Sequence, residues 1–204
     1  MQSIKTKTID PDLDSSGGNI LTWLSFAVVM TLMFGLLYPA VTTLLGQAIF
    51  PSQARGSLIE KNGVVVGSSL IGQSFSGGKY FIPRPSSAGN GYDPASASGS
   101  NAAPSNPTLH ERIATSAKEI AARDGVTLND IPADLITTSG SGLDPDISPK
   151  AAEIQVARVA RTRGISEAAV REAVVRHTQP ATFGVLGQAR VNVLELNLDL
   201  DGQK

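Results

Sequence analysis

The main feature of the hydrophobic pattern is a long apolar run near the N-terminus. Between Ser15 and Ala54 there is no Asp, Glu, Lys or Arg, and Ile20–Leu45 is apolar almost throughout. As a helix, this run would be about 39 Å long, enough to cross a hydrocarbon core of about 30 Å. A cleaved signal peptide is the alternative, but its apolar region is shorter, about 7–15 residues. The pattern therefore predicts a retained single-pass membrane helix over residues 20–45.

Small or weakly polar residues recur along one face of this predicted helix, at steps of three or four positions. They are Thr31, Gly35, Pro39, Thr42 and Gly46. In lipid, such a stripe lets a second helix approach closely, although small residues are also common in membrane helices in general. Pro39 has no amide donor and is expected to kink the helix. We therefore expect this face to pack on a partner helix.

After Pro51 the pattern becomes that of a small folded domain. Apolar residues flank Asn62-Gly63, a pair that suits the type I′ turn of a β-hairpin. The next stretch, Gln73 to Pro107, is rich in Gly, Ser, Pro and Asn and has no periodicity. It still contains SFSGGKYFIPRPSS, with three aromatic residues and two cations. We therefore expect an ordered irregular loop rather than a disordered linker.

Amphipathic helices are predicted over residues 107–124, 149–163 and 167–178. Their start signals are Asn106-Pro107, Ser148-Pro149 and Ser166, and Gly125 and Gly164 end the first two. The final ARVNVLELNLDLD alternates between apolar and polar residues, which predicts a closing strand. Strands at both ends with helices between them indicate an α+β domain.

Composition narrows the chemistry. The formal net charge is −1, so no basic field attracts nucleic acid or anionic lipid. Cysteine is absent, which excludes disulfides, thiolate zinc sites and a thiol nucleophile. His110 and His177 are the only histidines, so a multi-histidine metal centre is excluded. His177 ends a predicted helix, where an imidazolium suits the helix dipole.

Two motifs resemble binding sites but miss the required spacing. Gly78-Lys79 would belong to a phosphate-binding Walker loop, but Gln73 stands where the first glycine belongs and Tyr80 replaces Ser/Thr. A small anion nest at this turn is the weaker alternative. Asp144 and Asp146 supply only two of the carboxylates that a calcium loop needs. The residues thus leave two readings, an accessory subunit of a membrane complex or an anchored hydrolase or binding protein.

Several longer motifs resemble one family. They are YPAVTTLLGQAIFP, NGVVVGSSLIGQSF, YFIPRPSS, SGLDPDISPKAAEIQVARVARTRG and VNVLELNLDLD. Together they resemble the C subunit of the Kdp potassium-transporting P-type ATPase, in order, from about Tyr38 to the C-terminus. The resemblance implies a non-catalytic subunit of a high-affinity, ATP-driven potassium uptake pump. It also implies a role in assembly and, as a catalytic chaperone, in raising the ATP affinity of the ATPase subunit.

The resemblance further implies partners and a location. The partners are a channel-like potassium-binding subunit, an ATP-hydrolysing P-type subunit and a small membrane peptide. The chain is expected in the cell inner membrane, with a cytoplasmic tail (1–19), a membrane helix (20–45) and an extracytoplasmic domain (46–204). The flanking charges, Lys5 and Lys7 before the helix and Arg55 and Lys61 after it, do not orient it. No cofactor or metal is expected on this chain itself, whereas the complex uses ATP, magnesium and potassium.

The matching motifs also select individual residues. Gly35, Tyr38 and Pro39 are expected to set helix packing. Tyr80, Arg84, Pro85, Ser86, Asn101 and Asp144 are expected to order the long loop or face a partner. Gln155 matches a glutamine of the family's helix motif and is the candidate nucleotide contact.

The same resemblance bears on residues 136–152. The family pattern SGLDP-x-ISP does not require an acid at x, which is Asp146 here, and this argues against a two-carboxylate cation site. We therefore predict a corner, in which SGSG ends a strand, Asp144-Pro145 turns and Ser148-Pro149 starts a helix.

Overall fold

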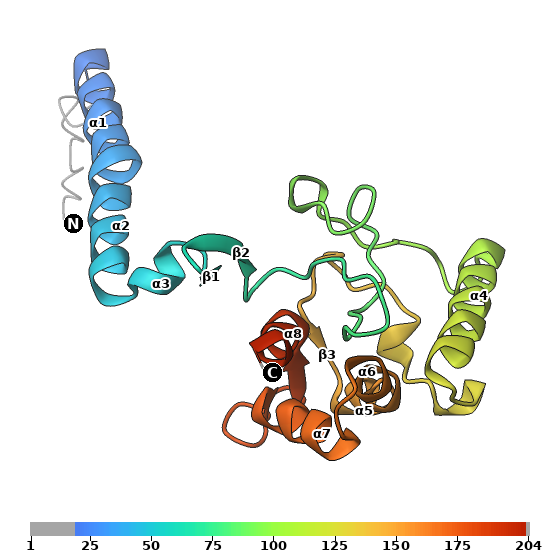
Figure 1. The fold of residues 1–204 in the computed structure, drawn as a ribbon. Coiled ribbons are helices and arrows are strands. Elements are labelled where there is room, and N and C mark those ends of the chain that lie inside the picture. The colour runs from blue at the N-terminus through green and yellow to red at the C-terminus, as the bar shows by residue number, and fades with distance from the viewer. Residues whose placement is uncertain (1–18, 203–204) are drawn as a thin grey trace, which may run out of the picture. The chain divides into compact units, whose positions relative to one another are not determined.

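The computed structural model describes residues 19–202, so most of the predicted N-terminal tail lies outside the described residues. The chain divides into two units, Met1–Arg55 and Gly56–Lys204. Figure 1 shows the helices and strands of each unit. Each unit is described by itself below.

The first unit is one long apolar helix followed by a short one. α1 (Ile20–Leu32), a π-helical turn (Met33–Leu37) and α2 (Tyr38–Ile49) run on without a break, and α3 covers Pro51–Ala54. The Ile20–Ile49 helix is strongly apolar, and it buries no residue of α1, of the π-helical turn or of α2. Among the described residues it is the one helix long and apolar enough to cross a membrane. A soluble core helix would be buried, so this exposure fits a segment that lies in lipid.

The disturbance expected at Pro39 takes the form of the π-helical turn. The Tyr38 amide donates to the Met33 carbonyl, five residues back. Proline has no N–H to donate, and its ring crowds the carbonyl four residues earlier. Widening the preceding turn relieves this crowding, as π-bulges do within α-helices.

The second unit begins with the predicted hairpin. β1 (Leu58–Lys61) pairs antiparallel with β2 (Val64–Ser68). Asn62 and Gly63 both have positive φ, 54° and 76°, as a type I′ turn requires. The long stretch that follows contains a single 3₁₀ turn, Pro94–Ser96, and its side chains and backbone bond to the rest of the domain. The prediction of an ordered irregular loop is confirmed.

The rest of the domain alternates helices with very short strands. The order is α4 (Pro107–Asp124), 3₁₀ turns at Leu128–Asp130 and Ala133–Leu135, β3 (Asp146–Ile147), α5 (Pro149–Glu153), α6 (Val156–Arg163), α7 (Glu167–Arg176), β4 (Thr178–Gln179), β5 (Arg190–Asn192) and α8 (Val193–Gly202). β5 is the central strand of an antiparallel sheet in the order β3-β5-β4. Figure 1 shows α5 to α8 gathered around β3. The α+β class is confirmed.

The core joins these helices to the irregular loop. Its most buried large side chains, each no more than 2% exposed, are Phe81, Ile147, Val156, Val159, Val170, Val191, Val193, Leu196 and Leu200. Phe81 belongs to the irregular loop, so this loop contributes to the core rather than covering it. The predicted caps are also present: Asn106, Ser148 and Ser166 each accept a backbone N–H at a helix start, and Gly125 and Gly164 end helices with left-handed φ.

The predicted C-terminal strand is wrong beyond its first residues. Only Arg190–Asn192 is a strand, and Val193–Gly202 is helix α8. The residues that α8 buries, Val193, Leu194, Leu196, Asn197 and Leu200, also fit a helical spacing. Leucine and glutamate favour helices, so tertiary burial selects the helical face over the alternating one.

The predicted helix over 149–163 is interrupted at Ile154 and Gln155. The Gln155 side-chain amide donates to the Ala151 carbonyl, the acceptor that the Gln155 main-chain N–H would use in a continuous helix. The main-chain N–H donates to Ala152 instead. The side chain thus displaces the backbone bond, and α5 and α6 are separate helices.

The predicted strand before SGSG is also absent from the described residues. Residues 136–145 are irregular, and the strand β3 follows the motif. A Cβ on Gly142 would lie 2.6 Å from the Ser98 carbonyl oxygen and 2.7 Å from the Ala88 nitrogen. This backbone therefore packs directly against the irregular loop, which a strand with side chains on both faces could not do.

Candidate functional site

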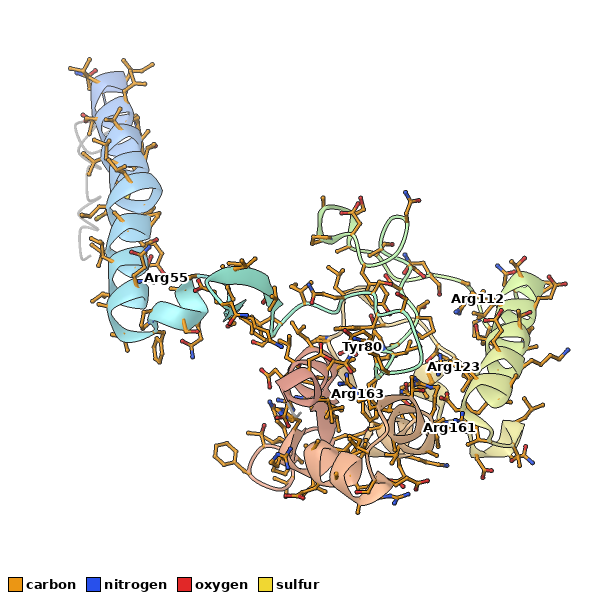
Figure 2. The ribbon with its side chains drawn as sticks, viewed as in Figure 1. Arg55, Tyr80, Arg112, Arg123, Arg161 and Arg163 are labelled. Carbon is orange, nitrogen blue, oxygen red and sulfur yellow. The ribbon has the colours of Figure 1, made fainter. Side chains whose placement is uncertain are left out.

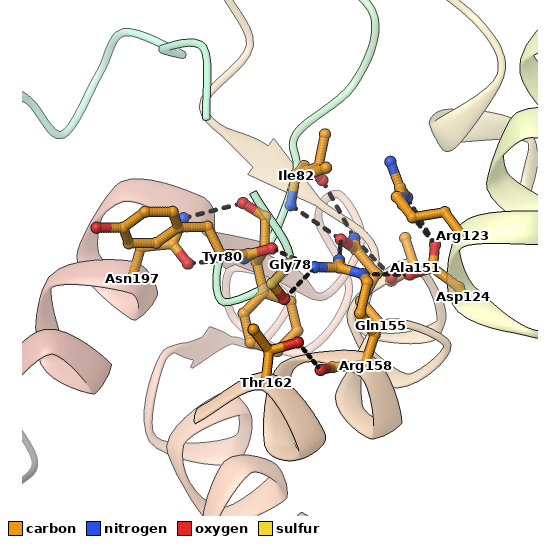
Figure 3. A network of polar contacts seen from close by, with 11 residues as sticks. Gly78, Tyr80, Ile82, Arg123, Asp124, Ala151, Gln155, Arg158, Thr162 and Asn197 are labelled. Carbon is orange, nitrogen blue, oxygen red and sulfur yellow. Dashed lines mark hydrogen bonds and ion pairs between the residues drawn. The ribbon is translucent and has the colours of Figure 1, made fainter. Parts of the chain in front are cut away.

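The centre of the domain is a segment of the irregular loop held by two buried side-chain amides (Figure 3). Asn197 on α8 accepts from the Phe81 N–H at 2.8 Å and donates to the Phe81 carbonyl at 2.9 Å. Gln155 does the same at Ile82, with 2.9 Å and 3.1 Å. Two amides thus satisfy an extended backbone that has no neighbouring strand, which explains why this loop is ordered.

A buried arginine completes this network. Arg158 is 4% exposed and donates through Nε to Asp124 at 2.6 Å. Its other nitrogens donate to the carbonyls of Gly78 and Tyr80 and to the Gln155 side chain. Burial lowers the pKa of Arg158, and the hydrogen bond and charge of Asp124 oppose that shift. Asp124 balances the buried charge of Arg158, and Arg123 also donates to the Asp124 carboxylate.

Tyr80, one of the predicted loop residues, lies at the edge of this network. Its hydroxyl donates to Asp201 at 3.2 Å, and its ring lies 5.5 Å from the Arg163 guanidinium. Figure 2 shows Tyr80 and Arg163 side by side. Arg163 also bonds to the Lys79 carbonyl and to Asp201. In the Gly-Gly-Lys turn that resembled a phosphate loop, the Gly78 carbonyl thus accepts from Arg158 and the Lys79 carbonyl accepts from Arg163. These hydrogen bonds hold the turn in place.

Arg84, Ser86 and Asp144 are also brought into one region. Arg84 pairs with Asp144 at 2.8 Å, which joins the irregular loop to the SGLDP motif. The Tyr92 hydroxyl donates to the Arg84 carbonyl, and the Ser86 hydroxyl accepts from the Tyr92 N–H at 2.8 Å. Burial raises the pKa of Tyr92 to about 12. These contacts connect the irregular loop to the rest of the domain. The predicted roles of Arg84, Ser86 and Asp144, in ordering the loop or facing a partner, stay predictions.

The two remaining loop candidates have lesser roles in the described chain. Pro85 lines a cleft of about 600 Å³ between the irregular loop and α4. Asn101 is exposed and has a left-handed backbone, with φ of 48°.

A second cleft, of about 580 Å³, contains both aspartates of the SGLDPDISP motif, with Asp134, Arg84 and Arg190. Asp144 is paired with Arg84 as above, and Asp146 lies 3.2 Å from Arg190. Burial, together with the charges of Asp144 and Glu195, raises the pKa of Asp146, and Arg190 opposes this shift. Each carboxylate already has an arginine, so the pair is not arranged for a cation. Over residues 19–202, no group of three acidic or histidine side chains could hold a metal ion.

The corner in this motif is built largely as predicted. The Asp144 side chain accepts the Asp146 N–H at 3.0 Å, which forms the turn around Pro145. Ser148 caps α5 by accepting the Ala151 N–H, and it is itself bonded to Asp134. The motif therefore turns the chain into β3 and then into α5.

Gln155, the candidate nucleotide contact, is completely buried. Its oxygen accepts two hydrogen bonds and its nitrogen donates two, so every polar position of the amide is used inside the domain. Contact with a nucleotide would require this network to open. The contact stays a prediction.

Sequence reasoning missed three of the buried polar residues, Asp124, Arg158 and Asn197. A usable signal was present at Arg158. It follows Gln155 by three positions and lies among the apolar residues Val156 and Val159, on the face that turns inward. A charged residue on the apolar face of a helix indicates a buried partner.

The membrane-helix candidates are all exposed or nearly so in the first unit. The hydroxyls of Thr31 and Thr42 donate hydrogen bonds to backbone carbonyls of the same helix, at 2.8 Å and 2.9 Å. A Cβ on Gly35 would meet nothing closer than a Thr31 methyl at 4.0 Å, and one on Gly46 would meet nothing within 4 Å. Tyr38 and Pro39 adjoin the π-helical turn. The face is therefore open to another helix.

Taken together, the fold and the site define a membrane-anchored protein. One apolar helix precedes an α+β domain. The buried side chains of Gln155, Arg158 and Asn197 form hydrogen bonds mainly to the backbone of that domain. Comparison with known proteins then gives the family, because the model of the K+-transporting ATPase c chain, KdpC, matches residues 20–202. The chain belongs to this family.

Individual relatives agree over almost the whole chain. The potassium-transporting ATPase KdpC subunit of Koribacter versatilis (strain Ellin345) is 49% identical over 184 residues, covering 90% of this chain and 94% of the relative. Its counterpart in Gemmatimonas aurantiaca is 53% identical over 180 residues, covering 86% and 90%. That of Geobacter sulfurreducens is 51% identical over 176 residues, covering 85% and 92%.

Proposed function

We propose that this chain is an accessory subunit of an ATP-driven potassium uptake pump. The observation that carries the proposal is the family match over residues 20–202, which includes both the apolar helix and the domain. The internal use of Gln155, Arg158 and Asp124 supports a structural role, because these polar side chains hold the fold together. Hydrolysis of ATP is then the task of a partner subunit.

The proposed location is the cell inner membrane, with the N-terminus cytoplasmic and the domain extracytoplasmic. The proposed partners are a channel-like potassium-binding subunit, an ATP-hydrolysing P-type subunit and a small membrane peptide. The open small-residue face of the helix supports contact with one of the membrane subunits. The irregular loop around Tyr80 and Arg84, which the buried network holds in place, is the second proposed contact face.

The proposed activity has two parts. The chain is needed for assembly of the complex, and it raises the ATP affinity of the ATPase subunit. A domain on the extracytoplasmic side has no access to cytosolic ATP, and Gln155 is completely buried. We therefore infer that the effect on ATP use travels through packing of the membrane helix against its partner.

The test is an affinity pull-down of the full-length chain from mildly solubilised membranes, with potassium-dependent ATPase activity assayed on the eluate. Co-elution of a P-type ATPase with that activity is the expected result. A lone chain without ATPase activity would instead indicate an anchored binding or hydrolytic protein. Calorimetry of the full-length chain in detergent should show no ATP binding, and binding in the micromolar range would overturn the helix-packing explanation.

A further inference from the structure

The π-helical turn Met33–Leu37 leaves one backbone carbonyl without a hydrogen-bond donor. A helical carbonyl accepts from the N–H four residues later, or five residues later in a π turn. For Phe34 these two positions are Tyr38 and Pro39. The Tyr38 N–H donates to Met33, and proline has no N–H. The Phe34 carbonyl therefore lacks both of its helical donors.

The depth of this carbonyl in the membrane makes the missing donor unfavourable. Phe34 lies midway along the Ile20–Ile49 helix, about 21 Å from each end at 1.5 Å per residue. The hydrocarbon core extends only about 15 Å on each side of its midplane, so water and lipid headgroups are out of reach. Membrane proteins satisfy such a backbone group from a neighbouring helix.

The two threonines near this turn do not supply the donor. The hydroxyls of Thr31 and Thr42 donate to other carbonyls of the helix, at 2.8 Å and 2.9 Å. Gly35 follows Phe34 and has no side chain, and a Cβ there would meet nothing closer than a Thr31 methyl at 4.0 Å. The backbone at this turn is therefore open to a donor from outside the chain.

Tyr38 adds a second polar group without a partner. It lies three positions after Gly35, on the same side of the helix, and is 60% exposed. No described residue forms a hydrogen bond with its hydroxyl. Tyrosines of membrane helices usually lie at headgroup level, but Tyr38 is about 16 Å before Ile49. Its side chain leans toward the N-terminus, away from that end, so the hydroxyl stays in the hydrocarbon region.

The two unpaired groups specify the chemistry of a partner. The Phe34 carbonyl needs a donor, whereas the Tyr38 hydroxyl both donates and accepts. A carboxamide or hydroxyl side chain has a donor and an acceptor, so it suits both groups. A charged side chain would lie unpaired at this depth, because this chain has no Asp, Glu, Lys or Arg between Ser15 and Ala54.

We propose that the turn around Gly35 packs against a membrane helix of another subunit of the same ATPase, where a carboxamide or hydroxyl side chain donates to the Phe34 carbonyl and bonds to the Tyr38 hydroxyl. The proposal rests on the proposed function, which supplies the neighbouring subunit. Glycine at position 35 lets the two backbones approach closely enough for a side chain to reach the carbonyl. A second copy of this chain would offer its own Tyr38 hydroxyl, and cross-linking distinguishes the two occupants.

Photocross-linking of the full-length chain in native membranes tests the contact. With Tyr38→p-benzoylphenylalanine, the expected product joins this chain to a membrane helix of a co-eluting ATPase subunit, within one helical turn of an Asn, Gln, Ser or Thr. Leu44 is the matched control position, because it is 67% exposed and lies two positions after Thr42, away from this face. The same probe there should give at least tenfold less of that product. A product with a second copy, with lipid only, or equal yield from both positions would overturn the proposal.

A second measurement removes single hydroxyls. Tyr38→Phe should lower recovery of the other subunits in the pull-down about threefold, the average effect of one interhelical hydrogen bond. Ser25→Ala is the matched control, because the Ser25 hydroxyl already donates to the Thr22 carbonyl at 3.0 Å, and recovery should not change. Full recovery with Tyr38→Phe, or an equal loss from Ser25→Ala, would overturn the hydrogen-bonding proposal and leave the proposed function intact. Absence of ATPase from the unmodified chain's eluate would overturn both.

The carbonyl is tested from the partner's side. The donor residue found by cross-linking is replaced with an apolar residue of similar size, alone and together with Tyr38→Phe. In the Tyr38→Phe background this replacement should still lower recovery, because the Phe34 carbonyl loses its donor. The combined loss should be smaller than the product of the two single losses, since both changes remove one shared contact. No further loss in the Tyr38→Phe background would overturn the assignment of the carbonyl.

Discussion

Replacing Asp124 with asparagine tests whether the buried arginine network stabilises the domain. Asp124 has no exposed side-chain area, and Arg158 is 4% exposed, with 2.6 Å between Arg158 Nε and the carboxylate. The Asp124→Asn substitution leaves the Arg158 charge buried without a counter-ion. Breaking a buried pair in this way costs about 3–5 kcal/mol. The free energy of unfolding should fall by this amount.

The assay is pulse proteolysis of the full-length chain in mild detergent across a urea series. With a urea dependence of about 2 kcal/mol per molar, the midpoint should fall by about 1.5–2.5 M. Arg123→Gln is the matched control, because it removes the other arginine from the same carboxylate but is 29% exposed. It should cost less than about 1 kcal/mol. Equal losses from the two variants, or a loss below 1 kcal/mol for Asp124→Asn, would refute the reasoning.

Three further substitutions test the corner, the helix face and the pH response. Gly142→Ala should destabilise the domain by about 2–4 kcal/mol, because φ is 71° and a Cβ would clash with backbone; Gly140→Ala, with open space, should cost less than about 1 kcal/mol in the same urea assay. Gly35→Leu should lower recovery of the other subunits in the pull-down at least severalfold, since the helix itself has room for the side chain; unchanged recovery would show that this face is not the contact. The raised pKa of Asp146 means that its carboxyl contributes stability below its unfolded pKa, about 3.9, and loses it as pH rises through the folded value. Asp146→Asn should therefore gain stability relative to the unmodified chain between pH 4 and pH 7, and a flat difference would contradict this.

Local signals in the sequence were enough for the elements whose ends carry their own chemistry. Asn62-Gly63 adopts the two positive φ values that a type I′ turn requires. Asn106, Ser148 and Ser166 cap helices, and Gly125 and Gly164 end them. Each of these features depends on a few neighbouring residues, so no distant contact is needed to predict it.

The errors all lie where a distant contact outweighs a local preference. The alternation of VNVLELNLDL predicted a strand, but burial of Val193, Leu196 and Leu200 on one face selected a helix. Gln155 suited a helix interior, yet its side chain bonds to Ile82 and interrupts the helix. A one-dimensional pattern cannot contain partners that are tens of residues away.

The sequence by itself thus determined a long uncharged apolar helix, an α+β domain and, through its motifs, the family. Only the tertiary structure decided what the polar residues of that domain do. The amides of Gln155 and Asn197 act as strand partners for the loop, and Arg158 is buried with Asp124. It also left Phe183, Val185 and Leu186 exposed. The physical reason is that apolar periodicity and turn chemistry act over a few residues, whereas burial of charge and exposure of apolar area depend on how the whole chain packs.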